Sequence, residues 1–169
     1  GTDDLTGSFT DLNGSINGVT AGSFDGLDDS VDGQFSSTIV EPIEVFVVSR
    51  SNDTGSANQT VYDGFSNATF AGRRWQDDAY QLFFGGSSLV QGTLTTNNEI
   101  WMTRHDSPDL IEINGTQVLS GSSGDGPLDG LSVGTNREGN FPLDGVMGQI
   151  LVYDPSASGY SRSGVYDYL

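Results

Sequence analysis

The sequence predicts an all-β protein, built as a sandwich or barrel of short antiparallel strands. Twenty-four of its 169 residues are glycine, and together with abundant Ser, Thr, Asn and Asp they indicate many turns. Runs of β-branched and aromatic residues recur between these turns at a spacing of roughly 8 to 12 residues, which is typical of sandwiches and barrels. The length fits one domain. We therefore treat residues 1–169 as a single domain, in which residues 1–23 supply only a weak strand and a loop.

The strongest expected strand is IEVFVVS, residues 43–49. Its alternation places Ile43, Val45 and Val47 on one face and Phe46 and Val48 on the other. The segment VMGQILVY, residues 146–153, is too short for a typical helix and is also expected to be a strand. Further strand-like runs are expected at residues 5–12, 30–35, 59–65, 80–84, 89–94, 100–105 and 131–134.

Turn-forming residues separate these runs. The clearest hairpin is LIEINGTQVL, residues 110–119, because Asn114-Gly115 is the pair favoured in a type I′ turn. Gly145 and Gly148 are expected to mark a bend into the last strand, and Asp154-Pro155 a turn after it.

Two other segments lack a strand pattern. The Ser/Gly-rich residues 119–130 predict a flexible loop. Only the last segment, residues 156–169, has the character of a helix, and its two glycines weaken that expectation.

The charge of the chain is extreme. Twenty-three acidic residues stand against six basic ones, all of them arginine, and give a formal net charge of −17. Self-repulsion of this size destabilises a compact fold, but in molar salt the Debye length falls to about 3 Å and most of the penalty disappears. Dense Asp without Lys therefore predicts a halophilic chain, of haloarchaeal or similar origin. An ordinary acidic surface that keeps the protein soluble is the alternative.

The composition also excludes several partners and chemistries. A strongly acidic chain is a poor partner for nucleic acid. No window approaches the roughly 18 consecutive apolar residues of a membrane span, so no membrane insertion is expected. The absence of cysteine removes disulfides and thiolate chemistry.

Four segments resemble the concanavalin A-like lectin/glucanase superfamily, and its laminin-G-like domains in particular. FDGLDDSVDG (24–33) resembles that family's motif F-D-G-x-D-D-Y-L-D, with Ser30 where an aromatic residue is usual. TIVEPIEVFVVSRSNDTGSANQTVYDG (38–64) is similar to its FTVFAVVRP…QTIFDG pair of strands. Trp101 with INGTQV resembles its W-x-x-V…V-N-G segment, and DGLSVGTNREGNFPLDGVMGQILVYD (129–154) resembles its closing pattern. Their shared order over residues 24–169 implies a two-sheet antiparallel jelly-roll β-sandwich with a short C-terminal helix, in which Trp101 belongs to the core.

The superfamily includes lectins, glycosidases and domains of phage and virus structural proteins, so its fold does not determine function. Its retaining glycosidases carry paired glutamates in an E-x-D-x-(x)-E arrangement, with carboxyls about 5 Å apart. None of the five glutamates here falls in that pattern, and Glu112 is expected to face solvent in its hairpin. The single His105 has no G-x-S-x-G elbow to serve and is expected to be a plain packed or surface residue. We therefore expect no catalysis, no zinc site and no required cofactor.

Calcium is bound by several branches of the superfamily. Asp25, Asp28, Asp29 and Asp144 lie in expected turns and offer the oxygen ligands that Ca²⁺ prefers. The family often has an acidic residue where this chain has Gln149, and that departure weakens an inherited site on the last strand. Solvated carboxylates on an acidic surface are the alternative to a calcium site.

The best candidate for sugar binding lies in AGRRWQDDAYQ, residues 71–81. A sugar site needs an aromatic platform beside polar groups, and Trp75 stands there with Arg73, Arg74, Asp77 and Tyr80. The arginines would equally suit docking onto an acidic protein. The alternative is that Trp75 covers the core at a strand start while the arginines pair with nearby Asp residues.

Five Asn-X-Ser/Thr sequons mildly indicate an exported or virion-surface protein. They lie at Asn13, Asn52, Asn58, Asn67 and Asn114.

The sequence as a whole predicts a non-catalytic binding or decoration module on a virion (capsid, turret, spike or tail) or on a cell surface. We expect it to recognise host-surface glycans or glycoproteins, and to join sibling subunits or a homo-oligomer. A purely structural decoration subunit and a glucanase-type hydrolase are the alternatives.

Overall fold

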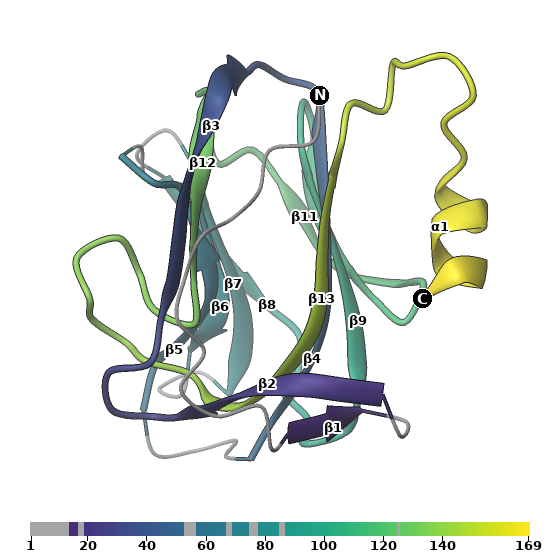
Figure 1. Ribbon diagram of the computed structural model, residues 1–169. Helices are drawn as coiled ribbons and strands as arrows, with labels where there is room; N and C mark the ends of the chain where they lie inside the picture. The colour runs from purple at the N-terminus through teal and green to yellow at the C-terminus, as the bar shows by residue number, and fades with distance from the viewer. Residues whose placement is uncertain are drawn as a thin grey trace.

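The computed structural model describes residues 14–16, 19–52, 57–66, 69–74, 78–84, 87–124 and 126–169. These residues form two antiparallel β-sheets that face each other, with a short helix beside one of them (Figure 1). No helix in this part of the chain is long and apolar enough to cross a membrane.

The sheet next to the helix has seven strands. In their spatial order they are β1 (Gly14–Ile16), β2 (Val19–Asp25), β13 (Asp144–Tyr153), β4 (Ile43–Ser51), β9 (Glu99–His105), β10 (Asp109–Ile113) and β11 (Thr116–Gly121). The second sheet has six strands, in the order β3 (Val31–Ile39), β12 (Leu128–Val133), β5 (Gln59–Asp63), β6 (Thr69–Arg74), β7 (Ala79–Phe84) and β8 (Ser87–Gln91). The helix α1 (Arg162–Tyr168) follows at the C-terminal end.

The all-β fold of two antiparallel sheets is confirmed, and so is the C-terminal helix. Asn114 and Gly115 join β10 to β11 with φ angles of 51° and 76°. Two consecutive left-handed residues are what a type I′ hairpin turn requires, so the expected hairpin is also confirmed.

Three strands, β1, β2 and β6, have no counterpart among the expected runs. Small residues are frequent in them, and Ala21, Gly22, Ala71 and Gly72 are buried in the described structure. A strand built on small residues lacks the β-branched and aromatic pattern by which strands are recognised. The expected strand at residues 5–12 lies outside the described residues.

The expected loop over residues 119–130 is shorter than predicted. Strand β11 continues to Gly121 and β12 begins at Leu128, so only the middle of this Ser/Gly-rich segment is loop. Ser123 in that loop is buried, and its N–H and hydroxyl donate to Asp109 Oδ2 at 2.6 and 2.8 Å.

Strand β13 contains a β-bulge at Gly148, where its register with β4 shifts between Met147 and Gln149. The bulge reverses the alternation of side chains along the strand. Before it, Met147 faces the space between the sheets; after it, Ile150 and Val152 do. Leu151 and Tyr153 therefore point to the outer face of the seven-stranded sheet. Gly148 thus marks a change of face within the strand, which is more specific than the bend expected there.

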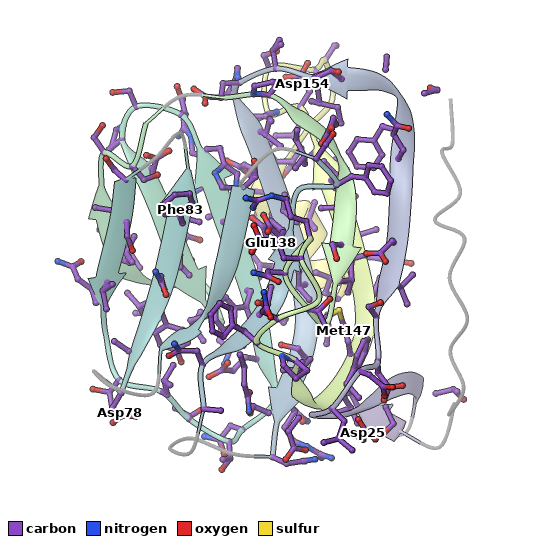
Figure 2. All side chains as sticks on the ribbon, turned by 90° about the vertical axis from the view of Figure 1, so that its left-hand side faces the viewer. Asp25, Asp78, Phe83, Glu138, Met147 and Asp154 are labelled. Carbon is purple, nitrogen blue, oxygen red and sulfur yellow. The ribbon has the colours of Figure 1, made fainter. Side chains whose placement is uncertain are left out.

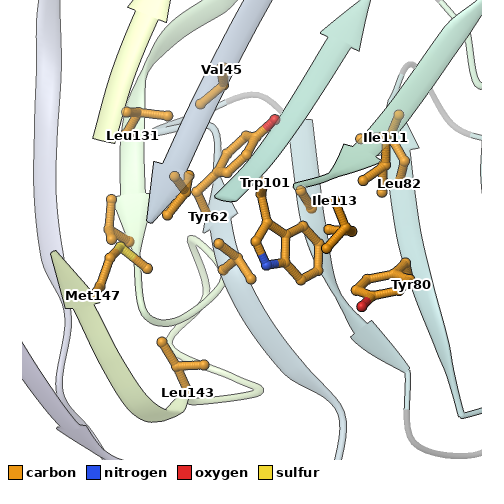
Figure 3. Packing of buried hydrophobic residues seen from close by; sticks show 14 of the residues in the cluster. Val45, Tyr62, Tyr80, Leu82, Trp101, Ile111, Ile113, Leu131, Leu143 and Met147 are labelled. Atoms are coloured by element: carbon orange, nitrogen blue, oxygen red, sulfur yellow. The ribbon is translucent and has the colours of Figure 1, made fainter. Parts of the chain in front are cut away.

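The main core lies between the two sheets and is centred on Trp101, Tyr62 and Tyr80 (Figure 3). Trp101 is fully buried, as expected, and its ring stacks edge-on against Tyr80 at a centroid distance of 5.0 Å. Ile43, Val45 and Val47 of β4 face this core. Phe46 of the same strand faces the opposite side, so the predicted alternation of β4 is confirmed.

A second apolar cluster covers the outer face of the seven-stranded sheet. Phe46, Met102 and Leu110 of the sheet pack with Val165 of α1. The seven-residue helix is too short to be stable alone, so this cluster is what holds it against the sheet.

A buried polar group sits within the main core. The Tyr62 hydroxyl contacts Thr103 Oγ1 and lies 2.8 Å from His105 Nε2. His105 is 0 % exposed, and burial lowers its pKa from 6.5 to about 3. The imidazole is therefore neutral and packed, as one of the two expected placements of His105 has it.

The stability of the fold should depend on pH through His105. The unfolded chain binds a proton at this residue below its ordinary pKa of 6.5, whereas the folded chain does so only near 3. The free energy of unfolding should therefore fall as pH decreases, by about 2 kcal/mol from His105 between about pH 8 and about pH 5. Urea denaturation across this range should give a flatter profile for His105→Gln than for the wild type. Equal slopes would contradict a neutral, buried His105.

Candidate functional site

A groove lies between the end of β13 and the C-terminal segment that carries α1. Its volume is about 510 Å³, within the range of roughly 300–1,000 Å³ that is typical of small-molecule sites. The lining is aromatic and hydroxyl-rich. It consists of Val152, Tyr153, Asp154, Ala157, Ser158, Gly159, Tyr160, Ser161, Gly164, Val165 and Tyr168.

The loop from β13 to α1 is shaped by turns that the sequence specifies. The Asp154 carboxylate accepts a hydrogen bond from the Ser156 N–H at 2.8 Å, and the backbone carbonyl of Asp154 accepts one from the Ala157 N–H at 3.1 Å. Ser161 caps α1, since its hydroxyl accepts the Gly164 N–H at 3.2 Å. These bonds hold the hydroxyl and carboxylate groups of the loop along the groove.

Three tyrosines provide the aromatic surface. The rings of Tyr153 and Tyr160 lie 5.4 Å apart, tilted by 46°. Tyr168 on α1 is 69 % exposed, and its hydroxyl accepts a hydrogen bond from the Gln149 side chain at 3.3 Å. The bulge in β13 brings Tyr153 and Gln149 to this outer face. The arrangement offers flat apolar surfaces beside polar groups, which is the chemistry of a site for a small hydroxylated ligand.

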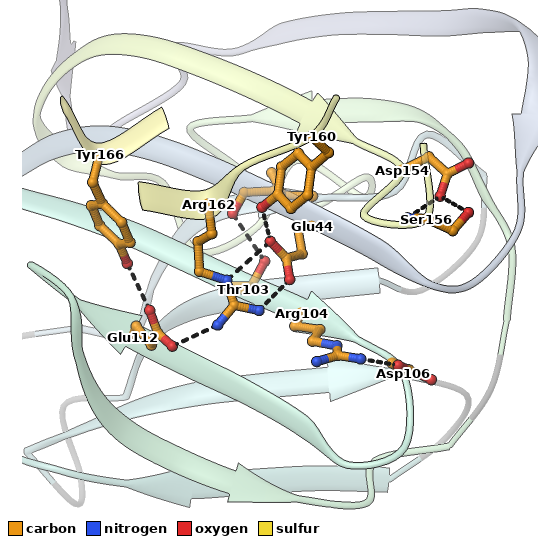
Figure 4. Close-up of polar contacts among 11 residues, drawn as sticks. Glu44, Thr103, Arg104, Asp106, Glu112, Asp154, Ser156, Tyr160, Arg162 and Tyr166 are labelled. Atoms are coloured by element: carbon orange, nitrogen blue, oxygen red, sulfur yellow. Dashed lines mark hydrogen bonds and ion pairs between the residues drawn. The ribbon is translucent and has the colours of Figure 1, made fainter. Parts of the chain in front are cut away.

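Tyr160 of the groove lining is held by an ionic network beneath α1 (Figure 4). Arg162 forms an ion pair with Glu44 of β4, and its Nη1 lies 2.9 Å from Glu112 Oε1 of β10. Two tyrosine hydroxyls complete the network: Tyr160 donates to Glu44, and Tyr166 donates to Glu112 at 3.0 Å. We call these five residues, Glu44, Glu112, Tyr160, Arg162 and Tyr166, the Arg162 clamp.

The clamp shifts the ionisation of its members in ways that stabilise it. The hydrogen bond and charge of Glu44 raise the pKa of Arg162 above its ordinary value, so the guanidinium stays charged. Burial, followed by the carboxylate of Glu44, raises the pKa of Tyr160, so its phenol stays protonated and continues to donate. Glu44 is only 1 % exposed, and the clamp supplies the donors that a buried carboxylate needs.

Three of the four expected calcium ligands come together at the opposite end of β13 from the groove. Figure 2 shows Asp25 near one end of the molecule and Asp154 near the other. Oxygen atoms of Asp25, Asp28 and Asp29 lie within 4.8 Å of one another. Asp144 pairs with Asp25 across β13 and β2, and its Oδ1 accepts the Asn52 amide at 2.9 Å.

The chemistry of this acidic loop suits a hard cation. Three carboxylates in one turn supply the oxygen ligands that Ca²⁺ uses. Asp25 and Asp29 each accept one backbone N–H within the loop, from Leu27 at 2.8 Å and from Asp25 at 3.0 Å. Asp144 is not part of the group of three, because its oxygens do not meet the same spacing.

The predicted sugar site around Trp75 can be followed only in part. Trp75 and Asp77 lie outside the described residues, and Arg73 and Arg74 are described only as backbone of β6. Tyr80 does not fit the prediction. It is 1 % exposed and its hydroxyl donates to Glu99 Oε1 at 2.7 Å, so it belongs to the core and offers no surface to a ligand.

The remaining glutamates also have defined partners. Glu99 is buried and accepts the Trp101 Nε1 proton at 2.9 Å. The expectation that Glu112 faces solvent is wrong, because Glu112 accepts hydrogen bonds from Arg162 and Tyr166 of α1. Glu41 accepts the Gly126 N–H at 2.9 Å, and Glu138 pairs with Arg137 at 3.7 Å.

Three of the five sequons lie among the described residues. Asn52 and Asn114 are exposed and Asn58 is partly buried. The side-chain amide of Asn52 donates a hydrogen bond to Asp144, and the side-chain Oδ1 of Asn114 accepts one from the Ile100 N–H at 2.8 Å. Asn13 and Asn67 lie outside the described residues.

The groove itself was missed from the sequence. Its tyrosines lie in the segment YDPSASGYSRSGVYDYL, residues 153–169. The high content of Tyr and Ser in this segment is the one sequence signal by which the groove could have been found. The pairing of Arg162 with Glu44 and Glu112 joins residues more than forty positions apart, and no local pattern reveals such a contact.

Removing the guanidinium of the Arg162 clamp should destabilise the fold. Arg162→Met leaves the Glu44 carboxylate buried without its cationic partner, at a cost of about 3 kcal/mol. Urea denaturation measures the change. The matched control is Arg104→Met, which removes the same charge from a partly exposed pair with Asp106 and should cost less than about 1 kcal/mol. Equal losses in the two variants would show that the clamp contributes nothing beyond a surface ion pair.

Comparisons with known proteins identify the architecture alone. No protein-family model and no curated protein matches the chain. Two solved structures of Trypanosoma rangeli sialidase are similar to it. One is in complex with the inhibitor DANA (TM-score 0.58, 9 % identity, 79 % of this chain and 25 % of the sialidase chain). The other is in complex with 2,3-difluorosialic acid (TM-score 0.57, 9 % identity, 82 % and 25 %). The chain spans about a quarter of the length of these sialidases, and at this identity the likeness is one of fold: an all-β sandwich.

Proposed function

We propose that the protein is a non-catalytic carbohydrate-binding module, and that the groove beside α1 is its binding site. The observation that carries the proposal is the lining of the groove, where three tyrosines stand beside Asp154, Ser158 and Ser161. A sugar ring has apolar C–H faces and polar hydroxyl edges, and this lining offers a surface to each.

Within this proposal the chain is a concanavalin A-like jelly roll displayed outside the cytoplasm, on a virion or a cell surface. It recognises host-surface glycans or glycoproteins and assembles with sibling subunits. The exposed sequons at Asn52 and Asn114 agree with such a location.

The engagement of three described glutamates supports a non-catalytic role. Hydrolysis of a glycosidic bond needs two carboxyl groups open to the substrate on either side of the bond. Glu44 and Glu112 are both committed to Arg162, and Glu99 is buried against Trp101.

Sialidases use a tyrosine as nucleophile, so Tyr160 beside Glu44 and Arg162 invites comparison with them. A nucleophile is activated either by a lowered pKa or by an adjacent general base. Burial and Glu44 raise the pKa of Tyr160, and the ion pair with Arg162 makes the Glu44 carboxylate a weak base. We therefore favour binding over hydrolysis at this groove.

A purely structural decoration subunit is the second candidate. Five large apolar side chains are exposed among the described residues, and they come from five separate segments: Leu27, Val40, Phe65, Phe141 and Tyr168. Light scattering combined with size exclusion separates the candidates, since a decoration subunit should form a symmetric oligomer and bind no sugar.

Two further parts of the proposal rest on charge. The acidic loop of Asp25, Asp28 and Asp29 is proposed to bind Ca²⁺, and added Ca²⁺ should then raise the Tm of the wild type more than that of Asp28→Asn.

The chain is also proposed to be halophilic, so raising NaCl from about 0.1 M to about 2 M should increase the free energy of unfolding by screening its self-repulsion. A free energy of unfolding that falls with added NaCl would refute the halophilic proposal. A Tm that does not change with added Ca²⁺ would refute the calcium proposal.

A glycan array in molar salt tests the binding role and its location. Tyr168→Ala removes an exposed aromatic platform of the groove and should weaken binding about tenfold. Trp75→Ala tests the surface predicted from the sequence and should leave binding unchanged. Loss of binding in Trp75→Ala alone would move the site to that surface, and the absence of binding to every glycan would rule out the carbohydrate role.

A further inference from the structure

The charge of the groove lining is negative. Asp154 is the only charged residue among the described side chains that line it. Hydrogen bonds from the Ser156 hydroxyl and N–H lower the pKa of Asp154, so the carboxylate is ionised across the neutral range. Both bonds end on Oδ1, which leaves Oδ2 available to a ligand.

The arginine of the adjoining clamp does not balance this charge. Arg162 follows Ser161 of the groove lining, but its guanidinium is directed to Glu44 and Glu112. Two carboxylates on one cation leave the clamp itself negative. An anionic ligand would therefore meet Asp154 and the clamp without gaining a free positive partner.

The aromatic corner adds a preference for positive charge. Tyr153 and Tyr160 lie against each other at 5.4 Å, and tyrosine faces attract cations through their quadrupole. The Tyr160 hydroxyl donates a hydrogen bond to Glu44, which leaves its ring more electron-rich and strengthens that attraction. A protonated amine near this corner would also lie within reach of Asp154.

We propose, on the basis of the carbohydrate-binding role above, that the groove selects amino sugars, with a protonated amine beside Asp154 and the tyrosines, over neutral and acidic sugars. The hydroxyls of Ser158 and Ser161 meet the polar edge of the ring, and the tyrosines meet its C–H face. The volume of about 510 Å³ leaves room for a sugar ring with its substituent.

Three monosaccharides with the same ring test the selection: glucosamine, glucose and glucuronate. Titrations of the full chain followed by NMR chemical shifts of α1 give the three dissociation constants. A single charge pair near water is worth about a fivefold change, so glucosamine should bind about fivefold tighter than glucose, and glucuronate weakest. The preference should shrink between about 0.1 M and about 2 M NaCl because salt screens the charge.

Two matched variants locate the selection. Asp154→Asn keeps an oxygen for the Ser156 bonds but removes the charge, so the preference for glucosamine over glucose should shrink to the part that the tyrosines and the clamp contribute. Asp167→Asn removes the same charge from an exposed position of α1 outside the groove lining, and it should preserve the preference.

The outcomes separate this inference from the role on which it rests. Equal binding of the three sugars, tightest binding of glucuronate, or an unchanged preference in Asp154→Asn would overturn the selection by charge and leave carbohydrate binding in place. Failure of all three sugars to shift α1, together with an array that shows no glycan binding, would overturn both.

Discussion

The pairing of β13 with both β2 and β4 is the constraint on which the rest of the fold depends. This ten-residue strand joins the edge of the seven-stranded sheet to its centre. Its first residue lies opposite Asp25 and its last opposite Glu44. The acidic loop and the Arg162 clamp are therefore held at the two ends of one rigid element. The distance between the two candidate sites is therefore determined mainly by the length of β13.

Burial of carboxylates is the second organising feature, since a chain with 23 acidic residues has only six arginines to balance them. Each buried acid is met by several fixed donors. Asp63 accepts two backbone N–H groups at 2.8 and 2.9 Å and the Arg137 guanidinium at 3.0 Å. Glu99 accepts from Trp101, Tyr80 and Thr95. Arg137 and Arg162 thus serve structure, and this agrees with a groove that carries no free cation among its described residues.

The parts of the structure that were predictable follow local rules. The alternation of β4, the Asn114-Gly115 turn and the burial of Trp101 depend on neighbouring residues or on a family pattern, and all three are confirmed. The close approach of Asp25, Asp28 and Asp29 was also accessible, because these residues lie within five positions in one turn. Strand β6 could not be predicted in this way. Its Ala71 and Gly72 are buried between neighbouring side chains, and neither residue type indicates a strand. Tyr80 looked like a surface aromatic because its partner Glu99 is nineteen positions away. The groove depends on contacts of longer range still.

The bulge at Gly148 has a consequence for relatives of this chain. One extra residue sets the phase of the second half of β13, so that Tyr153 reaches the outer face while Ile150 and Val152 stay inside. In a relative with one residue fewer at this point, the position of Tyr153 would turn toward the core and the groove would lose its floor, whatever tyrosines followed. The number of residues between the two halves of the strand, more than their identity, therefore distinguishes chains that share this groove from chains that share only the sandwich.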